Sequence, residues 1–315
     1  MNLKKPFFWD KTNPTFLSYL LFPITIIYIT IGLILNLKSK KKFSNIKSIC
    51  VGNIYIGGTG KTPLAIKLYK IIKKFQNDVV TGKKFYKSHI DEQLLLKKHS
   101  TTIIKPSRHE VISECLRQKH KVVIFDDGLQ DNYVKYDLKI ACFKSPNWIG
   151  NGMVIPSGPL RESLNSLKKY DLVFVKGDRN ENDQIVNSIK NINSKLEIFF
   201  YNYSIINHKD FNKNDNYLIF SGIGNPADFK KTINEMRLNI VKEIIFPDHY
   251  NFTKSDYEYI FKEAKLMDAK IITTEKDYER IEESDFKRKI NYVGIECKID
   301  KETNLIQYLK SIING

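Results

Sequence analysis

The chain has 315 residues, of which 42% are hydrophobic, so it is long enough and apolar enough for two globular domains. Its net charge of +16 suits an anionic membrane surface, a phosphorylated substrate or a nucleic acid, and equally a composition drifting toward lysine. The four cysteines lie far apart without a C-x-x-C pair, which argues against a zinc knuckle and a disulfide framework and fits a reducing compartment.

The first expected element is a hydrophobic helix over residues 16–37, within a stretch from residue 12 that lacks any charged side chain. About 20 apolar residues can cross a bilayer, so this helix either spans the membrane or lies in its interface, bent at Pro23. A buried core helix is the third reading. If the helix lies in the interface, its aromatic anchors would be Phe16, Tyr19, Phe22 and Tyr28. A basic cluster suited to the cytoplasmic surface follows: Lys38, Lys40, Lys41 and Lys42.

A strand pattern over 46–53, a glycine-rich turn and a helical run over 63–75 follow, which is the context of a phosphate-binding P-loop. Backbone N–H groups of such a turn point at phosphate oxygens, and the helix N-terminus adds its positive dipole end. Lys61 would reach the β- and γ-phosphates of ATP, and the Thr62 hydroxyl would bind Mg²⁺. Tyr55 replaces the first glycine of the strict motif, so an ordinary glycine-rich turn is the alternative. The nucleotide-binding residues would be Gly57, Gly58, Thr59, Gly60, Lys61, Thr62 and Pro63.

A strand over 121–125 ends at Asp126 and Asp127, after a helix that Ser107 and Glu110 should cap. Adjacent carboxylates at a strand end are costly unless cations or donors neutralise them, so we expect Mg²⁺ there, with a simple turn as the alternative. Two more strands, over 138–143 and 172–175, complete an α/β, doubly wound, P-loop NTPase-like sheet.

Strands and helices alternate again from about residue 216, which predicts a second, smaller α/β lobe. Expected strands cover 217–220, 241–246 and 271–274, expected helices cover 226–236 and 254–267, and a final strand and helix end the chain. Gly222 and Gly224 should form a tight turn. We therefore predict a membrane-associated helix over 1–42, a P-loop domain over 43–210 and the smaller lobe over 211–315.

Five sequence blocks, in the same order, resemble the tetraacyldisaccharide 4'-kinase family of lipid A biosynthesis. They are VGN leading into GGTGKTP (51–63), DDGLQ (126–130), GNGMVIPSGPLRE (150–162), Asp248-His249 and TTEKD (273–277). The resemblance implies ATP- and Mg²⁺-dependent phosphorylation of the 4'-hydroxyl of a tetraacylated glucosamine disaccharide 1-phosphate. It also implies catalytic domains on the cytoplasmic face of the bacterial inner membrane. The expected partners are this lipid A precursor and an anionic membrane surface, with no nucleic acid, and the chain is expected to be a monomer.

The resemblance also implies roles for single residues. Asp91 matches the aspartate of a D-E-P segment and would be the base, with His249 from the second lobe as its orienting partner after the lobes close. Arg161 and Glu162 match an active-site pair, with Arg161 a counter-charge for phosphate oxygens. From the residues alone, the better reading is that Asp91 is an acidic residue in the first turn of a helix and His249 a solvated loop residue.

Departures from the family's pattern and two rival functions remain open, and the departures include Leu129 and Asp131 within and after the DDGLQ block. Residues 81–87 replace the S-R-G-Y-G block that family members usually carry, and Gln93 replaces the proline of D-E-P. One rival is a membrane-recruited GTPase or ATPase switch, because the sequence 275–277 loosely resembles a guanine-reading N-K-x-D motif without its asparagine. The other is a non-catalytic relative of a kinase.

Overall fold

The computed structural model describes residues 5–36, 40–145, 148–282 and 284–314, so the predicted helix end at Leu37 and the basic Lys38 lie outside the described residues. The chain divides into two compact units. The first unit comprises Met1–Lys84, Thr101–Asn202 and Lys298–Gly315, and the second comprises Phe85–Ser100 and Tyr203–Cys297.

This division corrects the predicted boundaries at both ends of the second lobe. Residues 85–100 belong to the second unit because helix α4 (Ile90–His99) packs against α9 (Glu275–Tyr278). The chain end belongs to the first unit because β12 (Ile295–Ile299) lies beside β7 (Glu197–Ile205) and α11 (Glu302–Asn314) packs on α3 (Lys61–Lys73). The N-terminal helices also belong to the first unit.

An eight-stranded sheet with the order β12-β7-β6-β5-β1-β4-β2-β3 forms the centre of the first unit. The strand pairs from β7 across to β3 are parallel, which confirms the predicted doubly wound arrangement. Strands β2, β3 and β7 were not predicted. The remaining strands are β1 (Lys47–Gly52), β2 (Val79–Lys84), β3 (Thr102–Lys105), β4 (Val122–Asp126), β5 (Leu138–Lys144) and β6 (Leu172–Lys176).

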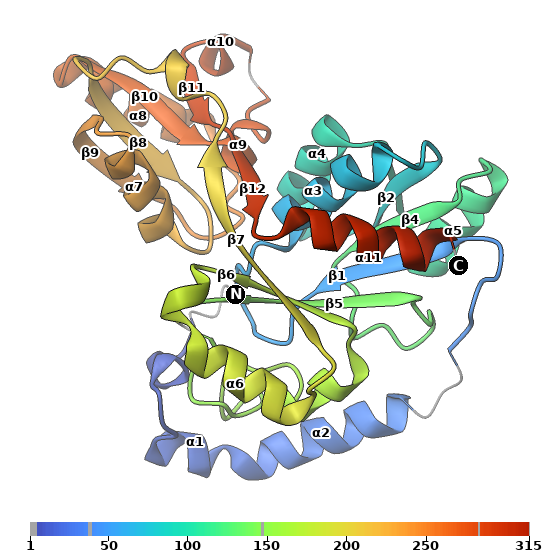
Figure 1. Ribbon diagram of the computed structural model, residues 1–315. Helices are drawn as coiled ribbons and strands as arrows, with labels where there is room; N and C mark the ends of the chain where they lie inside the picture. Colours follow the sequence, from blue (N-terminus) through green and yellow to red (C-terminus); the bar gives the residue numbers. More distant parts are fainter. Residues whose placement is uncertain (1–4, 37–39, 146–147, 283, 315) are drawn as a thin grey trace. The chain divides into compact units, whose positions relative to one another are not determined.

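Helices cover both faces of this sheet. Helix α3 packs against β1, β2 and β4 with α11 beside it, whereas α5 (Arg108–Arg117) and α6 (Asp183–Ile192) share the apolar core of the other face (Figure 1). The predicted cap of α5 is confirmed, because the Ser107 hydroxyl accepts from the Glu110 N–H. Ile124 and Phe125 are neighbours on β4 and point to opposite faces of the sheet, and both are fully buried. Strand β4 is therefore covered on both faces, as is usual in a parallel sheet.

The hydrophobic N-terminus forms two helices, α1 (Phe16–Leu20) and α2 (Phe22–Asn36), rather than one continuous helix. Pro23 sits in the first turn of α2, where its missing N–H costs nothing. Thr25 is the buried residue of α2, and its hydroxyl bonds to the carbonyl of Val154 and the hydroxyl of Ser157. Because the apolar side chains around it are mostly exposed, α2 is not the buried core helix of the third reading. In the described ranges, no helix combines the length and the hydropathy needed to cross a membrane. The exposed apolar side chains of α2 are Phe22, Ile24, Ile26, Ile27, Tyr28, Ile29, Ile31, Leu33, Ile34 and Leu35.

The second unit contains a four-stranded parallel sheet with the order β11-β10-β8-β9. Tyr217 and Ile219 pack with α7 on one face, and Leu218 and Phe220 pack with α8 on the other, as the two-residue period of a strand requires. The predicted cap of α8 is confirmed, since the Thr253 hydroxyl accepts from the Asp256 N–H. The elements are β8 (Asn216–Ser221), α7 (Pro226–Glu235), β9 (Asn239–Ile245), α8 (Lys254–Leu266), β10 (Ala269–Thr274), α10 (Ser284–Lys287) and β11 (Ile290–Val293).

A substitution at Gly82 tests the packing between β2 and α5. A Cβ at this position would lie 2.8 Å from Cγ1 of Val111 and 2.9 Å from Cγ2 of Val123, so Gly82→Ala should destabilise the chain by about 1–3 kcal/mol. The measurement is urea unfolding followed by circular dichroism. Gly32→Ala is the matched control, because no heavy atom lies within 4 Å of its Cβ, and it should not destabilise. Equal stability of the two variants would contradict this packing.

Candidate active site

The glycine-rich turn connects β1 to α3 in the first unit. Gly60 is the N-cap of α3 with φ of 79°, a left-handed conformation that strains other residues, and Gly57 also has positive φ, at 133°. The Asn53 side chain donates to the carbonyls of Tyr55 and Gly57, which holds the turn in place. All seven predicted nucleotide-binding residues therefore lie in this turn and the first turn of α3.

Tyr55 stands where the strict P-loop motif has its first glycine, yet the turn still forms. Its φ is not positive, so the backbone here does not require glycine. The ring is buried against Val154 and Leu160, and the hydroxyl donates to Asp10 at 3.0 Å. The turn is further held by Tyr201 on β7, whose hydroxyl donates to the carbonyl of Thr59 at 2.9 Å. The hydroxyl oxygen of Thr59 is itself buried and has no hydrogen-bond partner in the described part of the chain.

Asp126 ends β4 beside this turn and is completely buried. Its Oδ2 accepts from the Thr62 hydroxyl at 2.8 Å and from Lys83 Nζ at 2.5 Å. Its Oδ1 has no hydrogen-bond partner among the described residues. A buried carboxylate with one open oxygen next to a hydroxyl is the donor set that Mg²⁺ takes at P-loops, so these residues fit the metal. The described ranges contain no group of three or more His, Cys, Asp or Glu side chains that could hold a metal ion by itself.

Asp127 makes different contacts from those of its neighbour. Its Oδ2 lies 3.8 Å from Lys61 Nζ, and its Oδ1 lies 3.4 Å from Arg161 Nη1. Burial alone would raise the pKa of Asp127, but the charges of Lys61, Arg161, Lys83 and Arg108 outweigh it and hold the pKa below its usual range. Asp127 thus keeps the P-loop lysine and Arg161 near the turn.

Arg161 and Glu162 are not paired with each other. Arg161 Nη1 also donates to Gln130 Oε1 at 3.3 Å, whereas Glu162 Oε1 accepts from Gln130 Nε2 at 2.9 Å and from the Tyr170 hydroxyl at 3.1 Å. The two residues therefore meet through Gln130, which belongs to the DDGLQ block. Arg161 thus contacts both Asp127 and Gln130, while Glu162 fixes the amide of Gln130.

Asp91 and His249 lie together in the second unit. Asp91 stands in the first turn of α4 and is 1% exposed, so both readings of this residue hold: it is an acidic first-turn residue and also part of a cluster. His249 Nδ1 lies 2.8 Å from Asp91 Oδ2 and 3.0 Å from Oδ1. Because an ionised carboxylate only accepts, Nδ1 carries the hydrogen of this bond. His249 is therefore not a solvated loop residue.

Two cations complete the surroundings of Asp91. Lys276 Nζ lies 3.2 Å and Arg280 Nη1 3.9 Å from Asp91 Oδ2. Burial alone would raise the pKa of Asp91, but the His249 hydrogen bond and the charges of Lys276 and Arg280 lower it below its usual value. His249 has a left-handed φ of 57°, and its N–H donates to the carbonyl of Gly222, so the backbone also fixes this imidazole.

Sequence reasoning missed four side chains that matter in these clusters. Lys276 belongs to the TTEKD block and was noted only as part of the resemblance. The other three, Lys83, Arg108 and Arg280, carry no local signal, because each meets its partner through tertiary packing. Arg108 donates to the carbonyl of Asp127 at 2.7 Å and thereby holds its left-handed turn, where φ is 62°.

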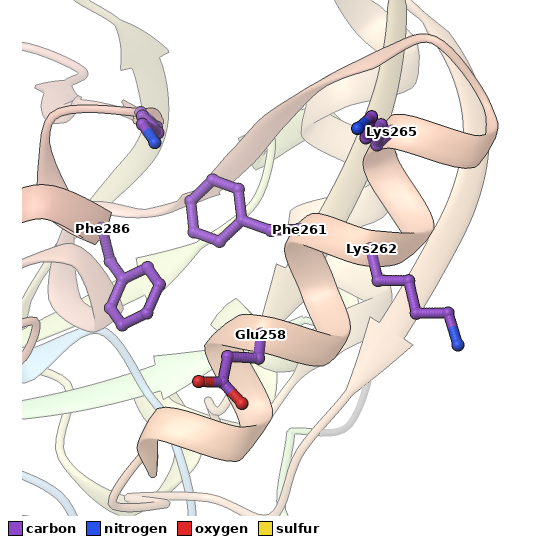
Figure 2. Close-up of a pocket in the computed structure, with 6 residues that line it drawn as sticks. Glu258, Phe261, Lys262, Lys265 and Phe286 are labelled. Atoms are coloured by element: carbon purple, nitrogen blue, oxygen red, sulfur yellow. The ribbon is translucent and has the colours of Figure 1, made fainter.

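An open hollow on α8 of the second unit contains none of these residues. Phe261 and Phe286 lie next to each other there, with ring centroids 5.4 Å apart, and charged side chains surround them (Figure 2). Its lining contains neither a glycine-rich turn nor a hydroxyl beside a buried carboxylate. The hollow is lined by Glu258, Phe261, Lys262, Lys265, Phe286 and Lys289.

Comparison with known proteins gives one consistent family. A family profile described as Tetraacyldisaccharide-1-P 4'-kinase matches residues 17–82 and 74–314. A tetraacyldisaccharide 4'-kinase of Pelagibacter ubique (strain HTCC1062) is 48% identical over 311 residues, covering 98% of each chain. One from Rickettsia bellii (strain OSU 85-389) is 36% identical over 301 residues, covering 90% of this chain and 91% of the relative.

Among solved structures, a crystal structure of LpxK from Aquifex aeolicus in complex with ATP is similar with a TM-score of 0.70. It is 20% identical, and the match covers 94% of this chain and 99% of that one. This likeness confirms the α/β fold.

The lowered pKa of Asp91 makes a prediction about stability and pH. Folding favours the ionised carboxylate, so its contribution is present above the unfolded pKa of about 4 and is lost as pH falls through the lower, folded pKa. Asp91→Asn should lower the free energy of unfolding at pH 7 by about 3–5 kcal/mol and flatten its fall below about pH 4. Urea unfolding between neutral pH and pH 3 measures this. Glu235→Gln breaks the exposed pair with Lys231 and should change little. An unchanged acid limb in Asp91→Asn would refute the assignment.

Proposed function

The chain belongs to the tetraacyldisaccharide-1-P 4'-kinase family, and on that premise we propose which of its residues carry out the reaction. It is an ATP-dependent kinase that phosphorylates the 4'-hydroxyl of a tetraacylated glucosamine disaccharide 1-phosphate, a lipid A precursor, and yields the 1,4'-bisphosphate. The observation that carries this conclusion is the near full-length match, at 48% identity, to a tetraacyldisaccharide 4'-kinase.

The turn over 57–63 is proposed to bind the triphosphate. Its backbone N–H groups and the start of α3 supply donors and a positive dipole end for the phosphate oxygens. Lys61, at the first position of α3, is 3.8 Å from Asp127 Oδ2 and exchanges this long contact for the β- and γ-phosphates. Arg161, partly exposed beside Asp127, adds a second cation for the charge on the transferred group.

Mg²⁺ is proposed to be held by Thr62 and Asp126, whose oxygens already lie 2.8 Å apart. Once bound, the metal neutralises charge on the β- and γ-phosphates. The open Oδ1 of Asp126 supports this choice, and Asp127 is occupied by Lys61 and Arg161 instead. Asp127 therefore orients cations near the phosphates rather than ligating the metal directly.

Asp91 and His249 are proposed to act as one proton-accepting pair. Asp91 supplies a negative charge that three cationic or donor groups keep ionised, and its hydrogen bond fixes the ring and tautomer of His249. A sugar hydroxyl is a poor nucleophile, so a fixed pair that accepts its proton promotes the loose phosphoryl transfer. The second unit also explains the partial N-K-x-D likeness, since Lys276 contacts Asp91 and Asp277 accepts from the Gly222 N–H. This removes the observation that favoured a GTPase.

The kinase activity is tested with labelled ATP and the disaccharide 1-phosphate lipid. Wild type should yield the bisphosphate, and Lys61→Ala should reduce kcat/KM by at least about a thousandfold because phosphate stabilisation is lost. His249→Ala should lower kcat by about 10²–10⁴-fold and change the affinity for ATP little.

The matched control is Lys67→Ala. Lys67 also lies on α3 but pairs with Glu302 at 3.0 Å, so its loss should leave turnover near the wild-type value. Full turnover in Lys61→Ala would show that the glycine-rich turn is not the nucleotide site.

We further propose that α1 and α2 lie in the cytoplasmic interface of the bacterial inner membrane, with the chain acting as a monomer. Most apolar side chains of α2 are exposed, while the Thr25 hydroxyl fixes the helix to the rest of the first unit. This combination is typical of a helix that lies in a membrane interface. Lys41 and Lys42 follow the helix and can meet anionic lipid head groups.

A double substitution tests this surface. Ile27→Asp with Ile31→Asp places two charges on exposed positions of α2, and partitioning onto phosphatidylglycerol vesicles should fall at least about tenfold. Sedimentation with vesicles measures the bound fraction. Leu266→Asp on α8, also at an exposed position, is the control and should bind as wild type does. Equal binding of the α2 variant would place the membrane contact elsewhere.

A further inference from the structure

Lys83 is a nearly buried lysine in the stretch that replaces the usual S-R-G-Y-G block. It lies on β2, one residue after Gly82, and is 3% exposed. Gly82 faces α5, because its missing Cβ would meet Val111, and successive residues of a strand point to opposite faces. Lys83 therefore points to the face covered by α3, where the phosphate-binding turn lies.

The ammonium of Lys83 contacts the carboxylate proposed for the metal. Since Gly82 pairs with Phe125, the next residues along the two parallel strands are Lys83 and Asp126. Lys83 Nζ lies 2.5 Å from Asp126 Oδ2, the same oxygen that accepts from the Thr62 hydroxyl. Taking two charges out of water is costly, so a pair this deeply buried requires both partners.

We infer that Lys83 acts as an internal counter-cation at Asp126, so that a divalent metal reaches this carboxylate only together with the nucleotide. This inference rests on the metal site proposed above. An ammonium beside Asp126 repels a second cation brought in alone, and Lys61 adds further positive charge nearby. A nucleoside triphosphate brings several negative charges, which attract both the metal ion and the Lys83 ammonium. Lys83 can then turn from Asp126 toward phosphate oxygens while the metal takes its place at Thr62 and Asp126.

Metal binding without nucleotide tests this inference directly. The full chain is titrated with Mn²⁺, and free Mn²⁺ is measured by electron paramagnetic resonance with and without a non-hydrolysable ATP analogue. Wild type should bind Mn²⁺ at this site only when the analogue is present. Lys83→Met removes the competing charge but keeps most of the side-chain volume, and it should bind Mn²⁺ alone at least about tenfold more tightly than wild type.

Lys84→Met is the matched control. Lys84 is the next residue on β2 and points to the other face, so its loss removes the same formal charge without freeing Asp126, and Mn²⁺ binding should stay as in wild type. A second control is Lys83→Met with Asp126→Asn, which removes both charges of the buried pair and should not gain Mn²⁺ affinity.

Two results would overturn the inference. One is wild-type protein that binds Mn²⁺ equally tightly with and without the analogue, a measurement that does not depend on whether any variant folds. The other is a folded Lys83→Met protein that binds Mn²⁺ no more tightly than wild type. The lipid phosphorylation assay tests the proposed function independently of this inference. It measures product formation by the wild-type chain, whereas the Mn²⁺ titration measures metal binding in the absence of nucleotide.

Discussion

The buried carboxylate of Asp126 is the constraint on which the nucleotide-binding unit depends. It is fully buried at the end of a central strand, where an unneutralised charge would be strongly unfavourable. Neutralisation comes from Lys83 on one neighbouring strand, and Thr62 at the start of α3 adds a hydrogen bond. The parallel sheet brings these three elements to one edge, so the positions of β2, β4 and α3 are tied to the same few atoms. What holds this edge together is also what presents a metal and phosphates with their ligands.

The second unit also contains a buried carboxylate whose charge is neutralised by its neighbours. Asp91 is almost completely buried, yet its surroundings of His249, Lys276 and Arg280 keep it ionised. Asp126 carries an open oxygen suited to a metal, whereas both oxygens of Asp91 are engaged by the imidazole. The two carboxylates thus suit different tasks, one in metal binding and one in proton transfer, because of the groups that share their burial.

The block from residue 150 to 162 serves two purposes within the first unit. Its first part holds the N-terminal helices, since the Asn151 side chain donates to the Ser18 hydroxyl and Ser157 bonds to Thr25. Its last part places Arg161 beside Asp127. One short segment therefore connects the apolar surface proposed to meet the membrane with the cations proposed to meet ATP. This double role gives a physical reason for the length and specificity of the block.

The sequence by itself determined what depends on neighbours along the chain. The phosphate-binding turn, the acidic end of β4 and the caps at Ser107 and Thr253 follow from local spacing and alternation. So do β1, β4, β5 and β6 of the first sheet and most strands of the second. Only the tertiary structure decided the rest. Lys83 meets Asp126 and Lys276 meets Asp91 across long stretches of chain, and β12 with α11 returns to the first unit against the predicted boundary. Such contacts leave no local pattern, because burial and charge pairing are settled by the whole packed fold and not by adjacent residues.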